Sequence, residues 1–185
     1  MIARTILCLA LLATPAHAER FEWHSAPAEN LEHVDIAQFA TARQTIDLAA
    51  YVLTDWAIMD ALRAAARRGV GVRVILDGSQ FKPGNHAGPF LALLAEPNVL
   101  VRVKPSTPDI MHLKAYALDG RLLRTGSANF SASGLKRQNN DLVLTDDRHA
   151  IDGFTKAFES IWDQSQGADT SSHEAPTPQH GRLER

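Results

Sequence analysis

Hydrophobic positions recur with two different periods along this chain, and the two periods alternate. Residues 30–43 and 150–162 place apolar side chains three or four positions apart, which predicts amphipathic helices. Residues 45–53 and 70–76 are instead short and almost continuously apolar, which is typical of buried strands. The sequence therefore predicts helices that each bury one side and strands that bury both.

A third helical pattern lies between the two strands. Asp55 is placed to cap it at the start, and Gly69 marks its end. The strand–helix–strand order predicts parallel pairing with a right-handed crossover. A short helix over 89–95 and strands over 99–103 and 141–145 continue the alternation. We expect an α/β fold with a mixed, mostly parallel sheet flanked by helices.

Polar and apolar side chains alternate in the stretch before the dipeptide Asp119-Gly120. The polar positions are His112, Lys114 and Tyr116. Alternation of this kind places the polar side chains on one face of a strand. Asp-Gly predicts a two-residue hairpin turn, since both turn positions need positive φ.

The expected hairpin brings chemically useful groups together. If Leu118 pairs with Arg121, counting back along both strands places Ser127 opposite His112, with Asn129 just beyond. An imidazole, the Lys114 ammonium, a hydroxyl and an amide would then converge at one end of the hairpin. These groups suit an anionic, oxygen-rich ligand such as a phosphodiester.

Asp119 has a different expected role. Seven residues of extended strand separate it from His112, a distance of about 23 Å. Aspartate also favours this turn position for backbone reasons. We predict that Asp119 is structural, or that it acts away from the histidine of its own chain.

The spacing of these residues resembles a known family. His112-x-Lys114-x4-Asp119, followed by Gly126-Ser127-Ala128-Asn129, is similar to the HKD motif of the phospholipase D superfamily. The resemblance extends over roughly residues 30–164 and is greatest for short bacterial endonucleases with a single motif. It implies the phospholipase D/nuclease-like fold and a phosphodiesterase that needs no metal ion or other cofactor.

The resemblance also implies a mechanism. A histidine attacks phosphorus to give a phosphohistidine, a second histidine protonates the leaving oxygen, and water resolves the intermediate. Lys114, Ser127 and Asn129 would stabilise the non-bridging oxygens. No other histidine in the chain has a lysine two positions later. We therefore expect a homodimer in which His112 of each copy contributes to one site.

One position departs from the family pattern. Related nucleases carry a carboxylate, thought to orient the histidine, where this chain has Asn140. Asp141 follows directly and is the second candidate. Either side chain could accept the imidazole N–H of His112, but only Asp141 would place a negative charge beside it.

The first residues read as a targeting segment. Arg4 is followed by the apolar stretch Ile6–Leu12 and by the small-x-small sequence Ala16-His17-Ala18, which predicts a signal peptide over residues 1–18. The stretch is too short to span a bilayer, so stable membrane insertion is not expected. The one cysteine, Cys8, lies in this segment. We expect a periplasmic or secreted protein, with an extension over 19–29, a catalytic domain over 30–165 and a disordered tail over 166–185.

The distribution of charge bears on the substrate. The whole chain has a net charge of −2, but residues 61–137 hold twelve Lys or Arg residues against four acids. Such an asymmetry favours a polyanionic partner, although solvated helix and strand faces would look the same. A nuclease acting on DNA, RNA or both is the leading hypothesis. A phospholipase D-type hydrolase acting on phospholipid headgroups is the alternative, and a non-catalytic nucleic-acid or envelope-binding domain is a third.

Overall fold

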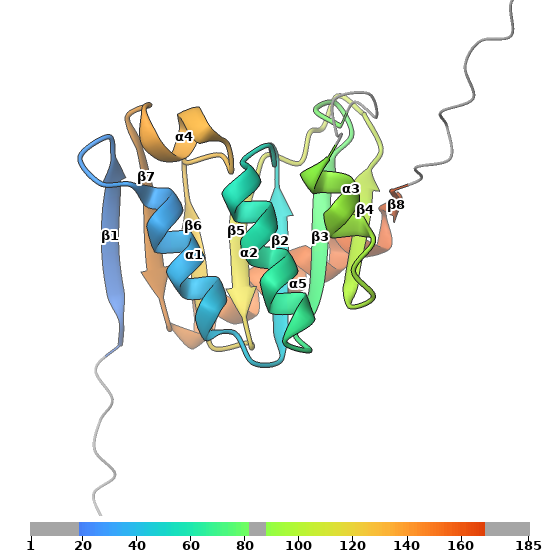
Figure 1. Cartoon of the computed structure of the whole chain (residues 1–185). Helices are drawn as coiled ribbons and strands as arrows, with labels where there is room; N and C mark the ends of the chain where they lie inside the picture. The colour runs from blue at the N-terminus through green and yellow to red at the C-terminus, as the bar shows by residue number, and fades with distance from the viewer. Residues whose placement is uncertain (1–18, 82–87, 169–185) are drawn as a thin grey trace, which may run out of the picture.

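The computed structural model describes residues 19–81 and 88–168, which form three layers (Figure 1). The strands of the central sheet are β1 (Phe21–Ala26), β2 (Thr45–Ala50), β3 (Gly71–Asp77), β4 (Val99–Lys104), β5 (Lys114–Leu118), β6 (Leu122–Gly126), β7 (Asn140–Thr145) and β8 (Gln166–Gly167). The helices are α1 (Leu31–Thr41), α2 (Trp56–Arg67), α3 (Pro89–Leu94), α4 (Ala132–Lys136) and α5 (Arg148–Asp163).

The sheet confirms the expected mixed α/β class and corrects its strand directions. Its order is β1-β7-β6-β5-β2-β3-β4-β8. The pairs β2–β3 and β3–β4 are parallel, and the other five pairs are antiparallel, so "mostly parallel" is wrong. The parallel pairs are those joined by the crossover helices α2 and α3. The later strands are joined by a tight turn and by the short helix α4, which return the chain in the opposite direction.

The helices α1 and α2 begin where the sequence predicts, whereas α5 begins two residues earlier than expected. The Asn30 side chain accepts a hydrogen bond from the Glu32 amide at 3.0 Å and caps α1. The Asp55 carboxylate accepts one from the Ile58 amide at 3.2 Å and caps α2. These caps satisfy amides that have no partner within the helix, which fixes each first turn by local chemistry.

Two hydrophobic clusters cover the two faces of the sheet. The larger one lies beneath α1, α2 and α3, the helices nearest the viewer in Figure 1. The smaller one lies beneath α5, on the opposite face, where Phe154, Phe158 and Trp162 pack against β5 and β6 residues such as Ala117 and Leu123. Burial on both faces explains why β5 is buried throughout.

The β5–β6 hairpin is present, but its register differs from the prediction by one residue. Asp119 and Gly120 both have positive φ, 53° and 59°, as expected. Leu118 pairs with Leu122 rather than with Arg121, so the connection has three residues. His112 lies before β5 begins, and the predicted pairing of His112 with Ser127 is therefore wrong.

Both ends of the described chain belong to the sheet. Residues 19–29 were expected to precede the domain, yet β1 lies within them and pairs with β7 over its full length. The expected tail begins at residue 166, but Gln166 and Gly167 pair with β4. The predicted signal peptide and the rest of the tail lie outside the described residues. Among the helices that are described, none is long and apolar enough to cross a bilayer.

Candidate active site

His112 lies on a short segment held from both sides. The Met111 amide donates to Oδ2 of Asp77, at the end of β3, at 2.6 Å. The Leu113 carbonyl accepts from the Tyr51 amide, just after β2, at 2.8 Å. The His112 ring packs edge-on against the Tyr51 ring with centroids 4.4 Å apart, and the residue is exposed to solvent. The backbone is fixed while the imidazole remains accessible, as a nucleophile requires.

Lys114 is the first residue of β5 and is only 7% exposed. Its Nζ donates to the His112 carbonyl at 2.8 Å and lies 4.8 Å from the centre of the Tyr51 ring. Burial lowers the pKa of this ammonium. No ion pair with a carboxylate is formed by Lys114 within the described part of the chain. A buried cation of this kind is prepared to receive an anion.

Ser127 and Asn129 lie on the connection between β6 and α4. The Ser127 amide donates to Oδ1 of Asp141 at 3.0 Å, its hydroxyl donates to the same oxygen, and the Asp141 amide donates back to the hydroxyl at 2.9 Å. Oδ1 of Asn129 is buried and has no hydrogen-bond partner among the described residues. That oxygen needs a donor, so any contact between Asn129 and a phosphate has to come from its amide nitrogen.

Gly126 explains how β6 comes so close to β7. A Cβ added there would overlap the Asp141 carbonyl oxygen and would lie 2.7 Å from Cα of Leu142. Its φ of 154° adds a conformational reason for glycine. Because Gly126 has no side chain, Ser127 can lie against Asp141 and the chain can continue toward Asn129.

Neither histidine-orienting candidate hydrogen-bonds His112. The Asn140 amide nitrogen donates to the Gly134 carbonyl at 2.9 Å and to Gln138 Oε1 at 3.2 Å. The Asp141 carboxylate binds Ser127, whose hydroxyl holds the pKa of Asp141 below its usual value. Asp141 is therefore an ionised partner of Ser127 rather than of the imidazole.

Asp119 lies at the far end of β5 from His112. Its carboxylate accepts hydrogen bonds from three successive backbone amides, those of Arg43, Gln44 and Thr45, the shortest at 2.8 Å. It therefore ties the β5–β6 turn to the connection between α1 and β2.

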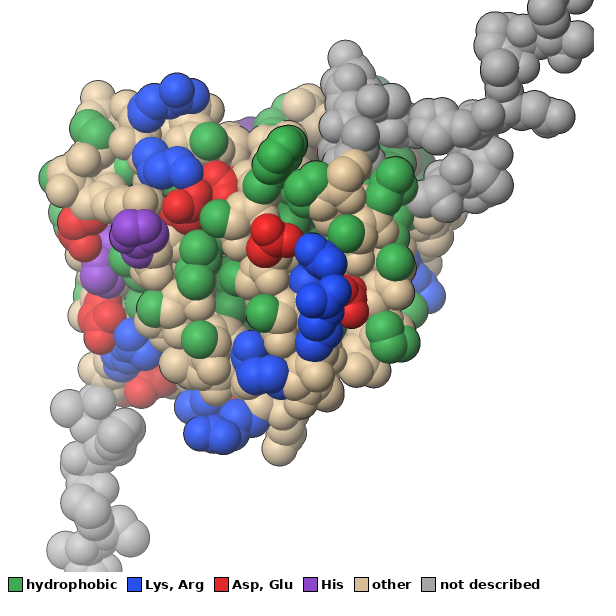
Figure 2. All heavy atoms as spheres, viewed as in Figure 1, with side chains coloured by type: hydrophobic (Ala, Val, Ile, Leu, Met, Phe, Trp, Pro, Cys, Tyr) green, Lys and Arg blue, Asp and Glu red, His purple; other side chains and the backbone are tan. Residues whose placement is uncertain are grey.

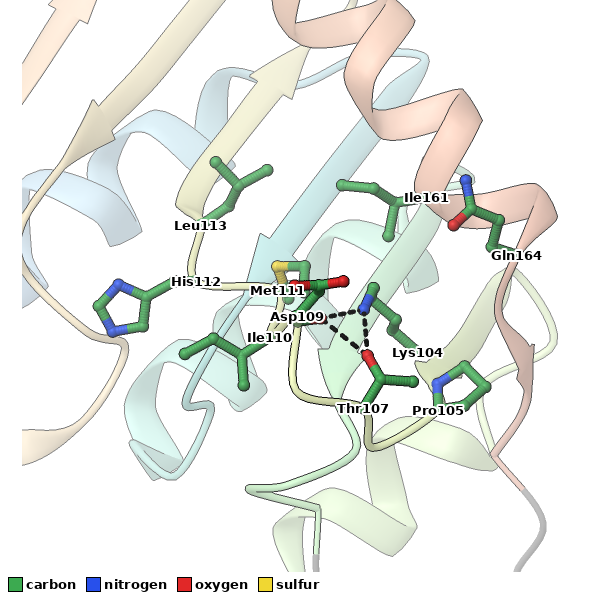
Figure 3. A pocket seen from close by; sticks show the side chains of 10 residues that line it. All are labelled: Lys104, Pro105, Thr107, Asp109, Ile110, Met111, His112, Leu113, Ile161 and Gln164. Atoms are coloured by element: carbon green, nitrogen blue, oxygen red, sulfur yellow. Dashed lines mark hydrogen bonds between the residues drawn. The ribbon is translucent and has the colours of Figure 1, made fainter.

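A cavity of about 710 Å³ lies beside His112. It is bounded by the 104–113 segment and the end of α5, and its lining includes Pro105, Ile110, Met111, Leu113 and Ile161 (Figure 3). In this view the His112 ring lies at one end of the cavity and points away from Lys104 and Thr107. The exposed imidazole thus borders this cavity, and its ring and the Lys114 ammonium both contact the Tyr51 ring.

Comparison with known proteins identifies the family. The family model described as "Cardiolipin synthase, PLD-like domain" matches residues 36–162, which include the whole His112–Asn129 constellation. The chain belongs to the phospholipase D superfamily. A mitochondrial cardiolipin hydrolase of Xenopus laevis is 30% identical over 141 residues, covering 72% of this chain and 65% of that protein. A phospholipase D of Rickettsia prowazekii is 32% identical over 120 residues, covering 64% and 56%. The matched part is thus roughly half to two thirds of the length of these relatives.

Solved structures show the same phospholipase D fold. Nuc from Salmonella typhimurium, a phospholipase D family member, superposes with a TM-score of 0.71 at 22% identity, covering 81% of this chain and 98% of Nuc. NucT from Helicobacter pylori gives 0.71 at 23% identity, covering 81% and 99%. Both are covered almost completely, so this chain contains the whole of their common fold.

Ion pairs weaken the expectation that the excess of Lys and Arg over residues 61–137 forms a surface for a polyanionic partner. Many bases of the 61–137 segment form ion pairs, namely Arg63, Arg67, Arg73, Arg121, Arg124 and Lys136. Figure 2 shows the result, with Lys and Arg gathered over α4 and along α2 beside acidic side chains. On this face, the basic side chains therefore do not form one continuous basic surface.

Several residues that shape the site were missed by sequence reasoning. Tyr51 was read as part of the strand over 45–53, and Asp77 follows the strand expected over 70–76. Asp35 and Arg124 were not singled out, although both side chains are completely buried. The sequence offered only a weak signal for Arg124, which directly follows Leu122 and Leu123 in the second strand of the predicted hairpin.

Proposed function

We propose that the chain is an exported, metal-independent phosphodiesterase that cleaves DNA, RNA or both and works as a homodimer. The observation that carries the proposal is the buried Lys114 ammonium, which pairs with no carboxylate of the described residues, on the same segment as the exposed His112. A phosphodiester provides the negative charge that the Lys114 ammonium would bind and the phosphorus atom that the His112 imidazole would attack. Export rests on the sequence pattern of residues 1–18.

The chemistry needs two histidines. An imidazole nitrogen of His112 attacks phosphorus, and the P–O bond to the leaving group breaks while the P–N bond forms. The His112 imidazolium of a second copy gives its proton to the leaving oxygen. Water then attacks phosphorus, its proton passes to that second imidazole, and the P–N bond breaks. Lys114 stabilises charge on the non-bridging oxygens throughout.

The extent of the fold shared with Nuc and NucT, together with an exposed arginine, supports nucleic acid as the substrate. Nuc and NucT are covered almost end to end by this fold, whereas the cardiolipin hydrolase relatives extend well beyond the matched part. Arg137, at the C-terminal cap of α4, forms no ion pair within the described residues and is exposed. It offers a phosphate contact beyond Lys114, and such contacts make binding weaken steeply with salt.

A phospholipid is the second candidate, favoured by a different observation. Five of the ten side chains that line the cavity beside His112 are apolar, and these suit acyl or glycerol carbons better than sugar hydroxyls. Relatives named cardiolipin hydrolase and phospholipase D support the same direction.

One experiment separates the candidates. The purified chain lacking residues 1–18 is incubated with plasmid DNA, with RNA and with cardiolipin or phosphatidylcholine vesicles, all in excess chelator. We expect cleavage of nucleic acid by the wild type and a loss of at least about 1,000-fold in His112→Asn. His149→Asn, which removes an exposed histidine of α5, is the matched control and should keep wild-type activity.

Each other outcome has a clear meaning. Turnover of vesicles alone would replace the nuclease by the phospholipase. Complete inactivation by chelator would contradict metal independence. Equal activity of the His112→Asn and wild-type proteins would remove His112 from the chemistry.

A further inference from the structure

A completely buried guanidinium lies behind the candidate site. Arg124 of β6 is 0% exposed, and its Nη1 donates to the Lys114 carbonyl at 2.6 Å. Nη1 and Nη2 both donate to the Ala128 carbonyl at 3.3 Å. One side chain thus joins the backbone that carries Lys114 to the backbone between Ser127 and Asn129.

The position of this link in the sheet is informative. The β5–β6 pairing ends at Tyr116 and Arg124, and beyond that point β6 continues to pair only with β7. The carbonyls of Lys114 and Ala128 lie past the last β5–β6 pair. The guanidinium binds both, and so takes the place of main-chain hydrogen bonds where the two strands separate to form the site.

The guanidinium is itself held firmly. Nε and Nη2 donate to the two carboxylate oxygens of Asp35, from α1, at 3.1 and 3.2 Å. Asp35 is also 0% exposed and accepts a further hydrogen bond from the Tyr116 hydroxyl at 3.0 Å. The Arg124 guanidinium carbon lies 4.6 Å from the centre of the Phe130 ring. Every donor nitrogen therefore has a partner, and the fork cannot rotate without breaking several contacts.

Stability alone is a poor explanation for such a network. Apolar residues of similar volume stabilise a core as well as a buried ion pair does, and often better. A fully bonded planar fork instead fixes distances and directions, which apolar packing does less sharply. The atoms whose separation it fixes belong to the two segments of the candidate site.

We propose that Arg124, oriented by Asp35, is a positioning residue that sets the separation between Lys114 and the Ser127–Asn129 segment in the reaction. This inference rests on the proposed phosphodiesterase function. Arg124 does not touch the substrate. It determines whether the ammonium of Lys114 and the groups of the 127–129 segment can reach the same phosphoryl group.

The test replaces the network as a whole. In the triple variant Asp35→Leu/Tyr116→Phe/Arg124→Met no buried charge or hydroxyl is left unpaired, but the Lys114 and Ala128 carbonyls lose the donors that Arg124 provides. The protein should therefore remain folded with a lowered melting temperature. With bis(para-nitrophenyl) phosphate as substrate, we expect kcat to fall by about 10- to 100-fold while KM changes much less. Arg124→Lys keeps the charge but lacks the fork, and its kcat should also fall.

Tyr116→Phe is the matched control. It removes one hydrogen bond to Asp35 and leaves both carbonyl contacts of Arg124, so it should lower the melting temperature with kcat within about twofold of wild type. If the triple variant does not fold, Arg124→Lys decides, because its charge still faces Asp35.

Failure of the inference and failure of the proposed function are distinguishable. Wild-type protein without activity on any phosphodiester would remove the proposed function itself. An active wild type together with an unchanged kcat in the folded triple variant, or in Arg124→Lys, would overturn the positioning role alone. A lowered melting temperature with normal kcat would assign the network to stability.

Discussion

At the scale of single residues, Lys114 combines burial with positive charge. Its ordinary pKa is 10.5, and burial lowers the pKa from there. Between the lowered and the ordinary pKa the folded protein binds fewer protons than the unfolded chain. The contribution of Lys114 to the free energy of unfolding therefore rises with pH in that window, while its ability to bind an anion declines.

Anion binding should show this titration directly. In the His112→Asn background, which cannot turn over substrate, oligonucleotide affinity should fall by roughly 10- to 100-fold as Lys114 loses its proton, at a pH below 10.5. Fluorescence anisotropy at constant salt measures it. Adding Lys114→Arg should move the fall to higher pH, because guanidinium keeps its charge. The same midpoint in both proteins would assign the titration to another group.

The sequence predicted the residues of the site better than their contacts. His112 and Lys114 could be found because their spacing from Asp119 and the Gly-Ser-x-Asn sequence is local. The partners of Asp141 and Asn140 could not be found, because they depend on how α4 turns back onto β7. The Arg124–Asp35 contact joins residues 89 positions apart, which no local pattern reveals.

At the scale of elements, Asp119 links the β5–β6 turn to the connection between α1 and β2. Burial alone would raise its pKa, but the amides of Thr45, Gln44 and Arg43 bind the carboxylate and hold the pKa below the ordinary 3.8. The ionised form therefore stabilises the fold at neutral pH. That contribution is lost as pH falls through the lowered pKa.

Asp119→Asn should separate this structural role from chemistry. We expect the free energy of unfolding at pH 7 to drop by about 1.5–3 kcal/mol, with kcat per folded molecule within about twofold of wild type. The difference from wild type should shrink as the pH is lowered toward the acid range. Urea unfolding across pH measures it, and Asp152→Asn, an exposed acid of α5, is the control. A large loss of kcat without a loss of stability would return Asp119 to the active site.

Helices and strands differ in how far the sequence predicted them. The starts of α1 and α2 were correct, because Asn30 and Asp55 act within one helical turn. The hairpin was present but its register was off by one, since the turn dipeptide fixes φ without fixing how many residues the connection uses. The pairing of β1 with β7 joins segments more than 100 residues apart, so the local pattern of 19–29 could not reveal a strand.

At the scale of the whole molecule, the proposed two-histidine mechanism makes a prediction about the oligomeric state. If one site uses His112 from two copies, a dimer with one His112→Asn subunit has no complete site. Mixing equal amounts of wild-type and variant protein, with full subunit exchange, should give about a quarter of the activity per total subunit of pure wild-type protein, whereas independent sites would give about half. Light scattering should show a dimer, and activity in direct proportion to the wild-type fraction would contradict a shared site.

The opening of the site past the last β5–β6 pair has a consequence for how this molecule can change. Distances inside a ladder are set by the peptide backbone and are the same for almost any sequence. Past Tyr116 and Arg124, the gap between the two strands is bridged by side-chain atoms instead. A single substitution can therefore change the width of this gap. Natural variation or engineering can in this way alter which phosphodiesters fit, while the sheet itself is unchanged.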